Sequence, residues 1–258
     1  MARIGFQMIM LKQHSDFANA LRTAADIGYE IAEPWGWKPP VSCSEQHRLA
    51  EAAGLTICSG HYQPNSEWVK PHLEELADLL SEAGARAWVL PGGYGGKTVD
   101  EMAASAGRLR AFYRDVLQPR GLGAEYHNHA TDIVPMFDGR TQVDLLLEHV
   151  PELSFQPDIG NAFLGGQTDT VAFLKRYGAR IGCLHVKDVR EDHEAREHGK
   201  GACATGDGIV DIAGAVAYAR SLGVEDFIVE QEGVEDDAEI ERILRRSYET
   251  VSEMLGRD

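Results

Sequence analysis

The sequence alternates between amphipathic segments with helical spacing and short runs of β-forming residues. Glycine suits the point where one gives way to the other, because it adopts the left-handed conformation in which many helices end. Five units carry such a glycine, at Gly28, Gly54, Gly84, Gly178 and Gly223. Ser42 and Thr98 each precede a glutamate by three residues, the spacing of a helix capping box. The chain is therefore predicted to be a series of helix and strand units.

The apolar runs predict eight strands, at residues 3–8, 30–33, 55–60, 86–90, 122–129, 153–158, 181–187 and 226–232. Eight strands that alternate with helices over about 250 residues are typical of a (β/α)8 TIM barrel. A doubly wound open sheet gives a similar alternation, but no G-x-G-x-x-G motif follows a strand, which weakens the dinucleotide-binding alternative. We therefore predict an α/β fold, a single-domain TIM barrel over residues 1–258.

Composition narrows the classes of function. The chain has 41 acidic and 25 basic residues, and its net charge of −16 opposes binding to nucleic acid and to anionic membranes. The apolar N-terminal stretch is too short to span a bilayer and lacks the features of a signal peptide. The four cysteines form no C-x-x-C pair, so neither a disulfide framework nor a thiolate zinc site is predicted. We expect a cytoplasmic protein that binds neither nucleic acid nor membranes.

Two segments between the predicted elements have an open interpretation. Residues 190–208 form a long polar loop, which is either a lid over a site or a solvated excursion. The glycine-rich residues 91–96 follow the fourth strand, where they form either a phosphate cradle or a flexible loop.

Ionisable side chains gather where the fifth to eighth strands end, although barrel strands buried on both faces should be apolar. Alternation places three groups of them on a common face within their strands: Glu125, His127 and His129; His185 and Lys187; Glu230 and Glu232. In a TIM barrel this face is the interior near the catalytic mouth.

A bound cation would remove the cost of burying these charges, which is several kcal/mol for each group without a partner. Two imidazoles and two carboxylates suit a divalent ion, with His127, Asp158, His185 and Glu230 as the ligands. The lack of thiolates indicates Mn²⁺, which we expect first, or Mg²⁺, Co²⁺ or Zn²⁺, rather than copper(I) or an iron–sulfur cluster. The alternative is a set of hydrogen-bonded ion pairs with Lys187 and the backbone, without a metal.

Five stretches of the chain resemble the xylose isomerase-like TIM barrels, a family of sugar phosphate isomerases and epimerases. They are Tyr126-His127-Asn128-His129, Pro157-Asp158-Ile159-Gly160-Asn161, His185-Val186-Lys187-Asp188, Gly206-Asp207-Gly208 and Val229-Glu230-Gln231-Glu232. The resemblance covers nearly the whole chain and implies one metal held by His127, Asp158, His185 and Glu230. Many members have a glutamate at the fifth-strand position, so Glu125 is the second choice there.

The resemblance also implies roles above the metal, with His129 and Lys187 as acid/base or substrate-polarising groups and Glu232 near them. A lysine beside a metal-bound carbonyl can stabilise an enolate, and a histidine can move a proton near neutral pH. The alternative for Lys187 is a salt bridge to Asp188 or Glu232. Four further residues are expected to contact substrate, although each could also serve packing: Glu33, Trp35, His61 and Gln156.

These observations favour a metal-dependent isomerase or epimerase that abstracts a proton next to the carbonyl of a sugar or keto-polyol. If the enolate expels a β-substituent, the same site is a dehydratase or lyase acting on a keto-inositol or 3-keto-sugar. An endonuclease IV-like phosphodiesterase is a remote alternative that the negative charge opposes, and a non-enzymatic sugar-binding barrel is another. The resemblance further implies a possible homo-oligomer.

Overall fold

The computed structural model describes residues 2–36, 39–92, 94–190 and 202–257. Its strands are β1 (Arg3–Gln7), β2 (Ile31–Glu33), β3 (Thr56–Ile57), β4 (Ser59–His61), β5 (Ala87–Pro91), β6 (Gly123–His127), β7 (Leu153–Gln156), β8 (Leu184–Val186), β9 (Asp188–Val189), β10 (Ala202–Cys203) and β11 (Asp226–Val229). Its α-helices are α1 (Phe17–Ile27), α2 (Cys43–Ala52), α3 (Leu73–Glu82), α4 (Val99–Phe112), α5 (Gln142–His149), α6 (Ile159–Leu164), α7 (Thr170–Tyr177), α8 (Ile212–Ser221) and α9 (Asp237–Met254). Short helical turns are η1 (Met8–Leu11), η2 (Lys70–His72), η3 (Tyr113–Leu117), η4 (Gln118–Arg120), η5 (Ala130–Ile133) and η6 (Gly178–Arg180).

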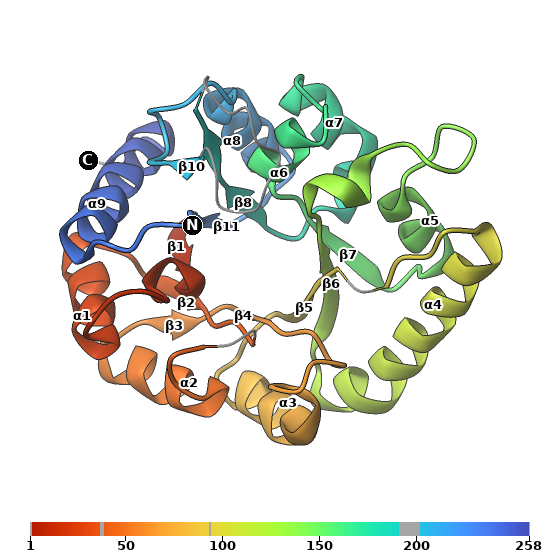
Figure 1. Cartoon of the computed structure of the whole chain (residues 1–258), viewed down its shortest axis with the longest axis horizontal. Coiled ribbons are helices and arrows are strands. Elements are labelled where there is room, and N and C mark those ends of the chain that lie inside the picture. The colour runs from red at the N-terminus through yellow and green to blue at the C-terminus, as the bar shows by residue number, and fades with distance from the viewer. Residues whose placement is uncertain (1, 37–38, 93, 191–201, 258) are drawn as a thin grey trace.

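The parallel strands form a closed ring surrounded by helices (Figure 1). One sheet has the order β3-β2-β1-β11-β8, and the other has the order β4-β5-β6-β7. β3 and β4 are the two halves of the predicted third strand; β3 pairs with β2 and β4 pairs with β5. Parallel bridges from Phe155 to Ile181 and from Asp158 to His185 join the two sheets on the other side. The predicted TIM barrel is confirmed.

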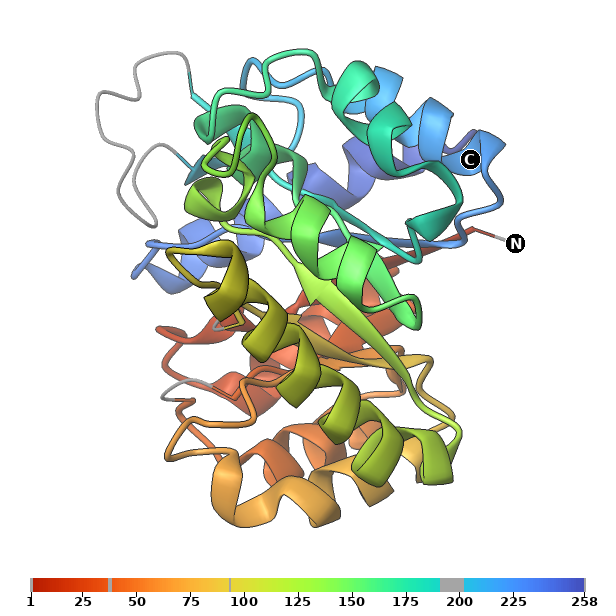
Figure 2. The same cartoon turned by 90° about the vertical axis from the view of Figure 1, so that its right-hand side faces the viewer.

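Among the described residues, every α-helix except α3 begins at a side chain that accepts a hydrogen bond from its first turn. Ser42 accepts from the Glu45 amide at the start of α2, and Thr98 accepts from the Glu101 amide at the start of α4, as their spacing predicted. The side view shows the helices outside the strands and both termini at the same end of the barrel (Figure 2). Among the described residues, no helix is long and apolar enough to cross a membrane.

The barrel interior is layered along its axis. Ile31, Cys183 and Ile228 are fully or almost fully buried, and each lies two positions before a polar residue of the upper layer. Gly5 lets β1 approach this apolar layer, because a Cβ there would lie 2.4 Å from Cγ1 of Ile31. Because side chains alternate along each strand, an apolar layer lies beneath the polar residues at the strand ends.

An ion-pair layer closes the end of the barrel where the strands begin. Arg86 donates two hydrogen bonds of 3.0 Å to the carboxylate of Glu125 and a further one to Asp226. Arg3 also pairs with Asp226, at 2.7 Å. Glu125 is thus engaged two positions before His127 on the same strand, which leaves His127 as the β6 side chain at the upper layer.

Candidate metal centre and active site

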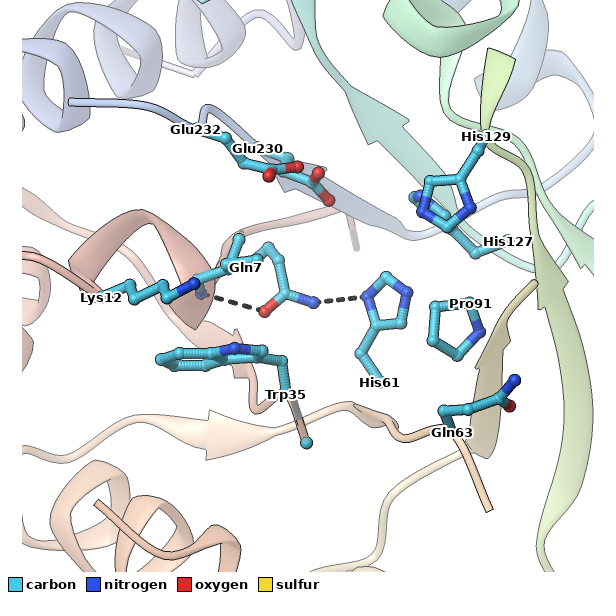
Figure 3. Close-up of a pocket in the computed structure, with 12 residues that line it drawn as sticks. Gln7, Lys12, Trp35, His61, Gln63, Pro91, His127, His129, Glu230 and Glu232 are labelled. Carbon is cyan, nitrogen blue, oxygen red and sulfur yellow. Dashed lines mark hydrogen bonds between the residues drawn. The ribbon is translucent and has the colours of Figure 1, made fainter. Parts of the chain in front are cut away.

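A pocket of about 470 Å³ opens among the strand ends. Figure 3 shows that both halves of the barrel line it. The first half contributes Gln7 at the end of β1, Trp35 after β2 and His61 at the end of β4. The second half contributes His127, His129, Glu230 and Glu232. Trp35 and His61 were expected at the pocket, and both line it.

Three of these side chains form a compact buried cluster with His185. His61, His127, His185 and Glu230 each offer one ligand atom, and these atoms all lie within 4.8 Å of one another. The exposed fraction of each side chain is 8% or less. Imidazole and carboxylate donors at this spacing could hold a divalent metal.

Hydrogen bonds orient His127 toward such an ion. The amide of Gln156 donates to Glu33 at 2.9 Å, so its oxygen faces His127 at 3.1 Å from Nδ1. Nδ1 must then carry the proton, which leaves the lone pair of Nε2 free on the cluster side. Burial and the nearby histidines His61 and His185 lower the pKa of His127 well below its usual value, so the ring is neutral. A neutral imidazole is the form that binds metals.

Glu33 lies behind His185 and orients it in the same way. Oε2 of Glu33 is 2.8 Å from Nε2 of His185, while Nδ1 lies 2.8 Å from Oε2 of Glu230. Burial alone lowers the pKa of His185, but the two carboxylates raise it to about 10. The ring is therefore protonated without a metal, and a cation between Nδ1 and Glu230 would replace that proton.

His61 differs from His127 in the direction of its hydrogen bonds. Oε1 of Gln7 accepts from the Ile9 amide at 3.2 Å, so the Gln7 amide nitrogen points to Glu33 at 3.1 Å and to Nδ1 of His61 at 2.5 Å. Nδ1 of His61 then accepts, and Nε2 carries the proton. That atom is buried and has no hydrogen-bond partner in the structure. In this tautomer His61 is a hydrogen-bond donor aimed at the cluster, suited to an oxygen of a substrate.

Asp158 borders the cluster, and the positive charge around its carboxylate does not fully offset the cost of burying it. Its Oδ2 lies 3.8 Å from Nε2 of His127, and its carboxylate accepts hydrogen bonds from the amide and side chain of Asn161 at 2.7 and 2.9 Å. Burial, opposed by Lys187 but reinforced by Glu230, raises the pKa of Asp158 to about 6. A divalent cation beside the carboxylate would favour its ionised form, so the residues present fit a metal.

Lys187 stands among three carboxylates and is 4% exposed. Its Nζ lies 3.0 Å from Glu230, 3.2 Å from Glu232 and 3.8 Å from Asp158. Burial opposes the charge, but these carboxylates raise the pKa of Lys187 well above its usual value. The salt bridge to Glu232, the alternative role considered for Lys187, is present, and its contacts with Glu230 and Asp158 match the ion pairs considered as the alternative to a metal.

His129 follows β6 and begins η5. Its backbone amide donates to Oδ2 of Asp132 at 2.8 Å, and its Nδ1 is 3.7 Å from the same oxygen. Burial opposes protonation, but Asp132 raises the pKa of His129 above its usual value. The imidazole is partly exposed at the pocket, with its ring centre 5.6 Å from that of His127 (Figure 3).

Two residues expected to contact substrate have another location. Glu33 and Gln156 are both 0% exposed, and neither lines the pocket. They lie behind the histidines: Gln156 is opposite His127 in the β6–β7 pairing and contacts its Nδ1, and Glu33 contacts Nε2 of His185 at 2.8 Å. The structure therefore makes them orienting residues for His185 and His127. Glu125, the second choice as a ligand, pairs with Arg86.

Sequence reasoning missed several polar residues from the first half of the barrel. Gln7, Lys12 and Gln63 all line the pocket. Gln7 had a signal, because it is the polar residue that ends the apolar run of the first strand. Lys12 lies in the loop after that strand, and Gln63 follows the third, so neither falls within a periodic pattern. The polar loop that was expected as a lid or a solvated excursion lies largely outside the described residues.

Comparison with known proteins identifies the family. The model of the xylose isomerase-like TIM barrels matches residues 21–254. The chain belongs to this family. A comparison with curated proteins gave no significant match.

Solved structures of the same barrel cover nearly the whole chain. A sugar phosphate isomerase/epimerase from Parabacteroides distasonis ATCC 8503 has a TM-score of 0.77 and 21% identity, over 98% of this chain and 96% of that one. The probable 3-DHS dehydratase AsbF of petrobactin synthesis, from Bacillus anthracis, has a TM-score of 0.71 and 16% identity, over 97% and 98%. The IOLI protein with a bound zinc atom has a TM-score of 0.74 and 13% identity, over 98% of each chain. At these identities the likeness establishes the fold that this xylose isomerase-like barrel shares with them.

Proposed function

We propose that the protein is a divalent-metal-dependent isomerase or epimerase that acts on a sugar or keto-polyol. The observation that carries the proposal is the buried cluster of three histidines and Glu230, with ligand atoms within 4.8 Å of one another at the floor of a pocket. The family and its structural neighbours, among them isomerases or epimerases and a zinc-bound barrel, support the same interpretation.

We infer that His127, Asp158, His185 and Glu230 hold the metal. In support, His127 presents a lone pair to the cluster, and burial raises the pKa of Asp158 to about 6 despite Lys187 at 3.8 Å, which a divalent ion would offset. Mn²⁺ is the ion we propose first. A bound divalent ion would polarise a substrate carbonyl and stabilise negative charge on its oxygen.

The chain's own residues orient the substrate and move its protons. His61 would donate a hydrogen bond from Nε2 to a substrate oxygen, and Trp35 offers an apolar wall to one face of the sugar. His129, which is partly exposed at the pocket, would exchange a proton with the carbon next to the carbonyl. Lys187, held by Glu230 and Glu232, would supply positive charge where the enolate develops.

A dehydratase or lyase is the second candidate, and the likeness to the probable 3-DHS dehydratase supports it. Proton removal next to a carbonyl is common to both reactions. They differ only in whether the proton is returned to carbon or a β-substituent is expelled.

The test is an NMR screen of ketoses, keto-inositols and 3-keto-glycosides in D₂O with metal-loaded protein, read after the protein is removed. An isomerase or epimerase is expected to incorporate deuterium next to the carbonyl and to give a product of unchanged composition, whereas a dehydratase product lacks water. Protein stripped of metal with a chelator is the control. Folded, metal-loaded protein that causes neither exchange nor conversion in any substrate class would contradict the proposal.

A further inference from the structure

The pocket contains one cation that is unlike its other charged groups. Lys12 lines the pocket, yet it has no hydrogen bond or ion pair from its side chain to any of the described residues. Each other ionisable group in the lining faces a partner within 4.0 Å: His61 faces Glu33, His127 faces Asp158, His129 faces Asp132, and Glu230 and Glu232 face Lys187. In a chain with a net charge of −16, a lysine without an acidic partner is unusual, and this one lies beside the candidate site.

The backbone that carries Lys12 is fixed. Its amide donates to the carbonyl of Ile9 at 3.0 Å, which ends η1, and η1 begins where Gln7 accepts from the Ile9 amide at 3.2 Å. Figure 3 shows the ammonium of Lys12 extending into the pocket near Trp35, across from His127 and His129. Lys12 is therefore placed to meet the end of a substrate that points away from the histidines.

Gln63 provides an unmatched acceptor in the same pocket. Its amide nitrogen donates to the carbonyl of Gly92 at 3.2 Å, and only the nitrogen can make that bond. Oε1 of Gln63 is therefore the free atom of the amide, and it is buried without a hydrogen-bond partner. A buried acceptor without a partner costs free energy unless a ligand donates to it, and a sugar hydroxyl is such a donor.

We propose that Lys12 and Gln63, which lie at opposite sides of the pocket (Figure 3), bind the two ends of a polyhydroxylated keto acid, with its carboxylate on Lys12 and a hydroxyl donating to Gln63. This inference rests on the proposed function, since the carbonyl end of the acid must lie at the histidine cluster. A carboxylate fits better than a phosphate, because the lining has one lysine and no arginine. Phosphate dianions usually take several charged or backbone donors.

The experiment uses three ketohexoses that differ only at carbon 6: D-fructose, with a hydroxyl group; D-fructuronate, with a carboxylate; and D-fructose 6-phosphate. Binding to the metal-loaded protein is measured by calorimetry, and deuterium exchange by NMR. We expect D-fructuronate to bind about 10- to 100-fold more tightly than D-fructose, the range of one charge-assisted hydrogen bond.

Variants assign the effect to the two residues. Lys12→Met is expected to remove the 10- to 100-fold preference for D-fructuronate over D-fructose, while Lys12→Arg keeps part of it. Gln63→Met is expected to weaken D-fructose and D-fructuronate equally, by about 2- to 10-fold. Lys175→Met removes the same charge from an exposed position on α7 and is the control, with no change expected.

The outcomes separate this inference from the proposed function. Tighter binding of D-fructose 6-phosphate overturns the carboxylate assignment. Equal binding of D-fructose and D-fructuronate, no binding of D-fructuronate, or a Lys12→Met variant that keeps the preference overturns the Lys12 subsite, and Gln63→Met without effect overturns the Gln63 contact. A preference for D-fructuronate that depends on Lys12, without exchange in any of the three, supports the subsite and shows that none of the three undergoes the proposed reaction, whereas the proposed function is contradicted only when no substrate class exchanges.

Discussion

Replacing Lys187 with methionine tests how the charges of the site are balanced. The side chain keeps its length, but the ammonium that lies 3.0 to 3.8 Å from Glu230, Glu232 and Asp158 is lost. Removing one partner of a buried ion pair costs about 3–5 kcal/mol, and proton uptake by Asp158 offsets part of this. A loss of about 3 kcal/mol lowers the melting temperature of a chain of this size by about 6–12 °C. We expect this shift in the metal-free variant at pH 7.5.

Two further measurements show whether the carboxylates cause the loss. A divalent cation carries the charge that the variant lacks, so Mn²⁺ should raise its melting temperature more than that of the wild type. The pKa of Asp158 is about 6 beside Lys187, and loss of that ammonium raises it further, so this carboxylate takes up a proton as the pH falls and the deficit should shrink between pH 7.5 and 5. Turnover should fall by about 10²-fold or more with metal retained, the loss expected for one transition-state donor.

Differential scanning calorimetry with Lys175→Met as the control measures the stability. A metal-free Lys187→Met protein as stable as the wild type at pH 7.5, or a deficit independent of both pH and metal, would refute this account.

Glu230→Gln removes the charge of a proposed ligand but keeps its shape, so we expect the purified variant to lack stoichiometric metal by elemental analysis. The wild type should hold about one divalent ion per chain. Equal metal content in the two proteins would exclude Glu230 as a ligand. His129→Gln should keep the metal but slow exchange of the substrate proton with solvent, because it removes the proton carrier and leaves the ligands in place; unchanged exchange would reassign the base. Burial lowers the pKa of His47 to about 4, and its Nε2 is 2.8 Å from the hydroxyl of Tyr62. Since the unfolded chain protonates His47 near pH 6.5, its contribution of about 3 kcal/mol is present above that pH and is lost as the pH falls to 4. His47→Gln should flatten this part of the pH dependence of unfolding in urea, and an unchanged slope would contradict the assignment.

The strands were predictable because they are short apolar runs, five of which follow a helix-ending glycine. The third strand was predicted as continuous, but it divides at Cys58, since Ile57 pairs with β2 and Ser59 pairs with β5. That division follows from closing the sheet into a ring, which requires each strand to tilt and shift against its neighbours. Hydrophobic alternation along one strand carries no information about that shift.

The same limit explains which site residues were placed well. Alternation put His127, His185 and Glu230 on interior faces, and they meet in one cluster. It could not give depth, so Glu33 was expected at the pocket, whereas Glu33 is fully buried with its Oε2 2.8 Å from Nε2 of His185. Depth in a barrel depends on the stagger between strands that are distant in sequence. The direction of each hydrogen bond also depends on tertiary packing, so only the structure shows it.

The ends of β1 and β2 act on the site by orienting its side chains, whereas His61 at the end of β4 belongs to the buried cluster itself. Gln7 from β1 donates to Glu33 at the end of β2, and Glu33 holds Nε2 of His185 on β8 at 2.8 Å. His185 in turn faces Glu230 after β11. Partners of this kind fix the ring orientation of a metal ligand, and their loss typically costs 10- to 100-fold in metal affinity or activity. The polar ends of β1 and β2 therefore hold the ligand geometry from behind, while Lys12 and Gln63 remain free to select the substrate in front of it.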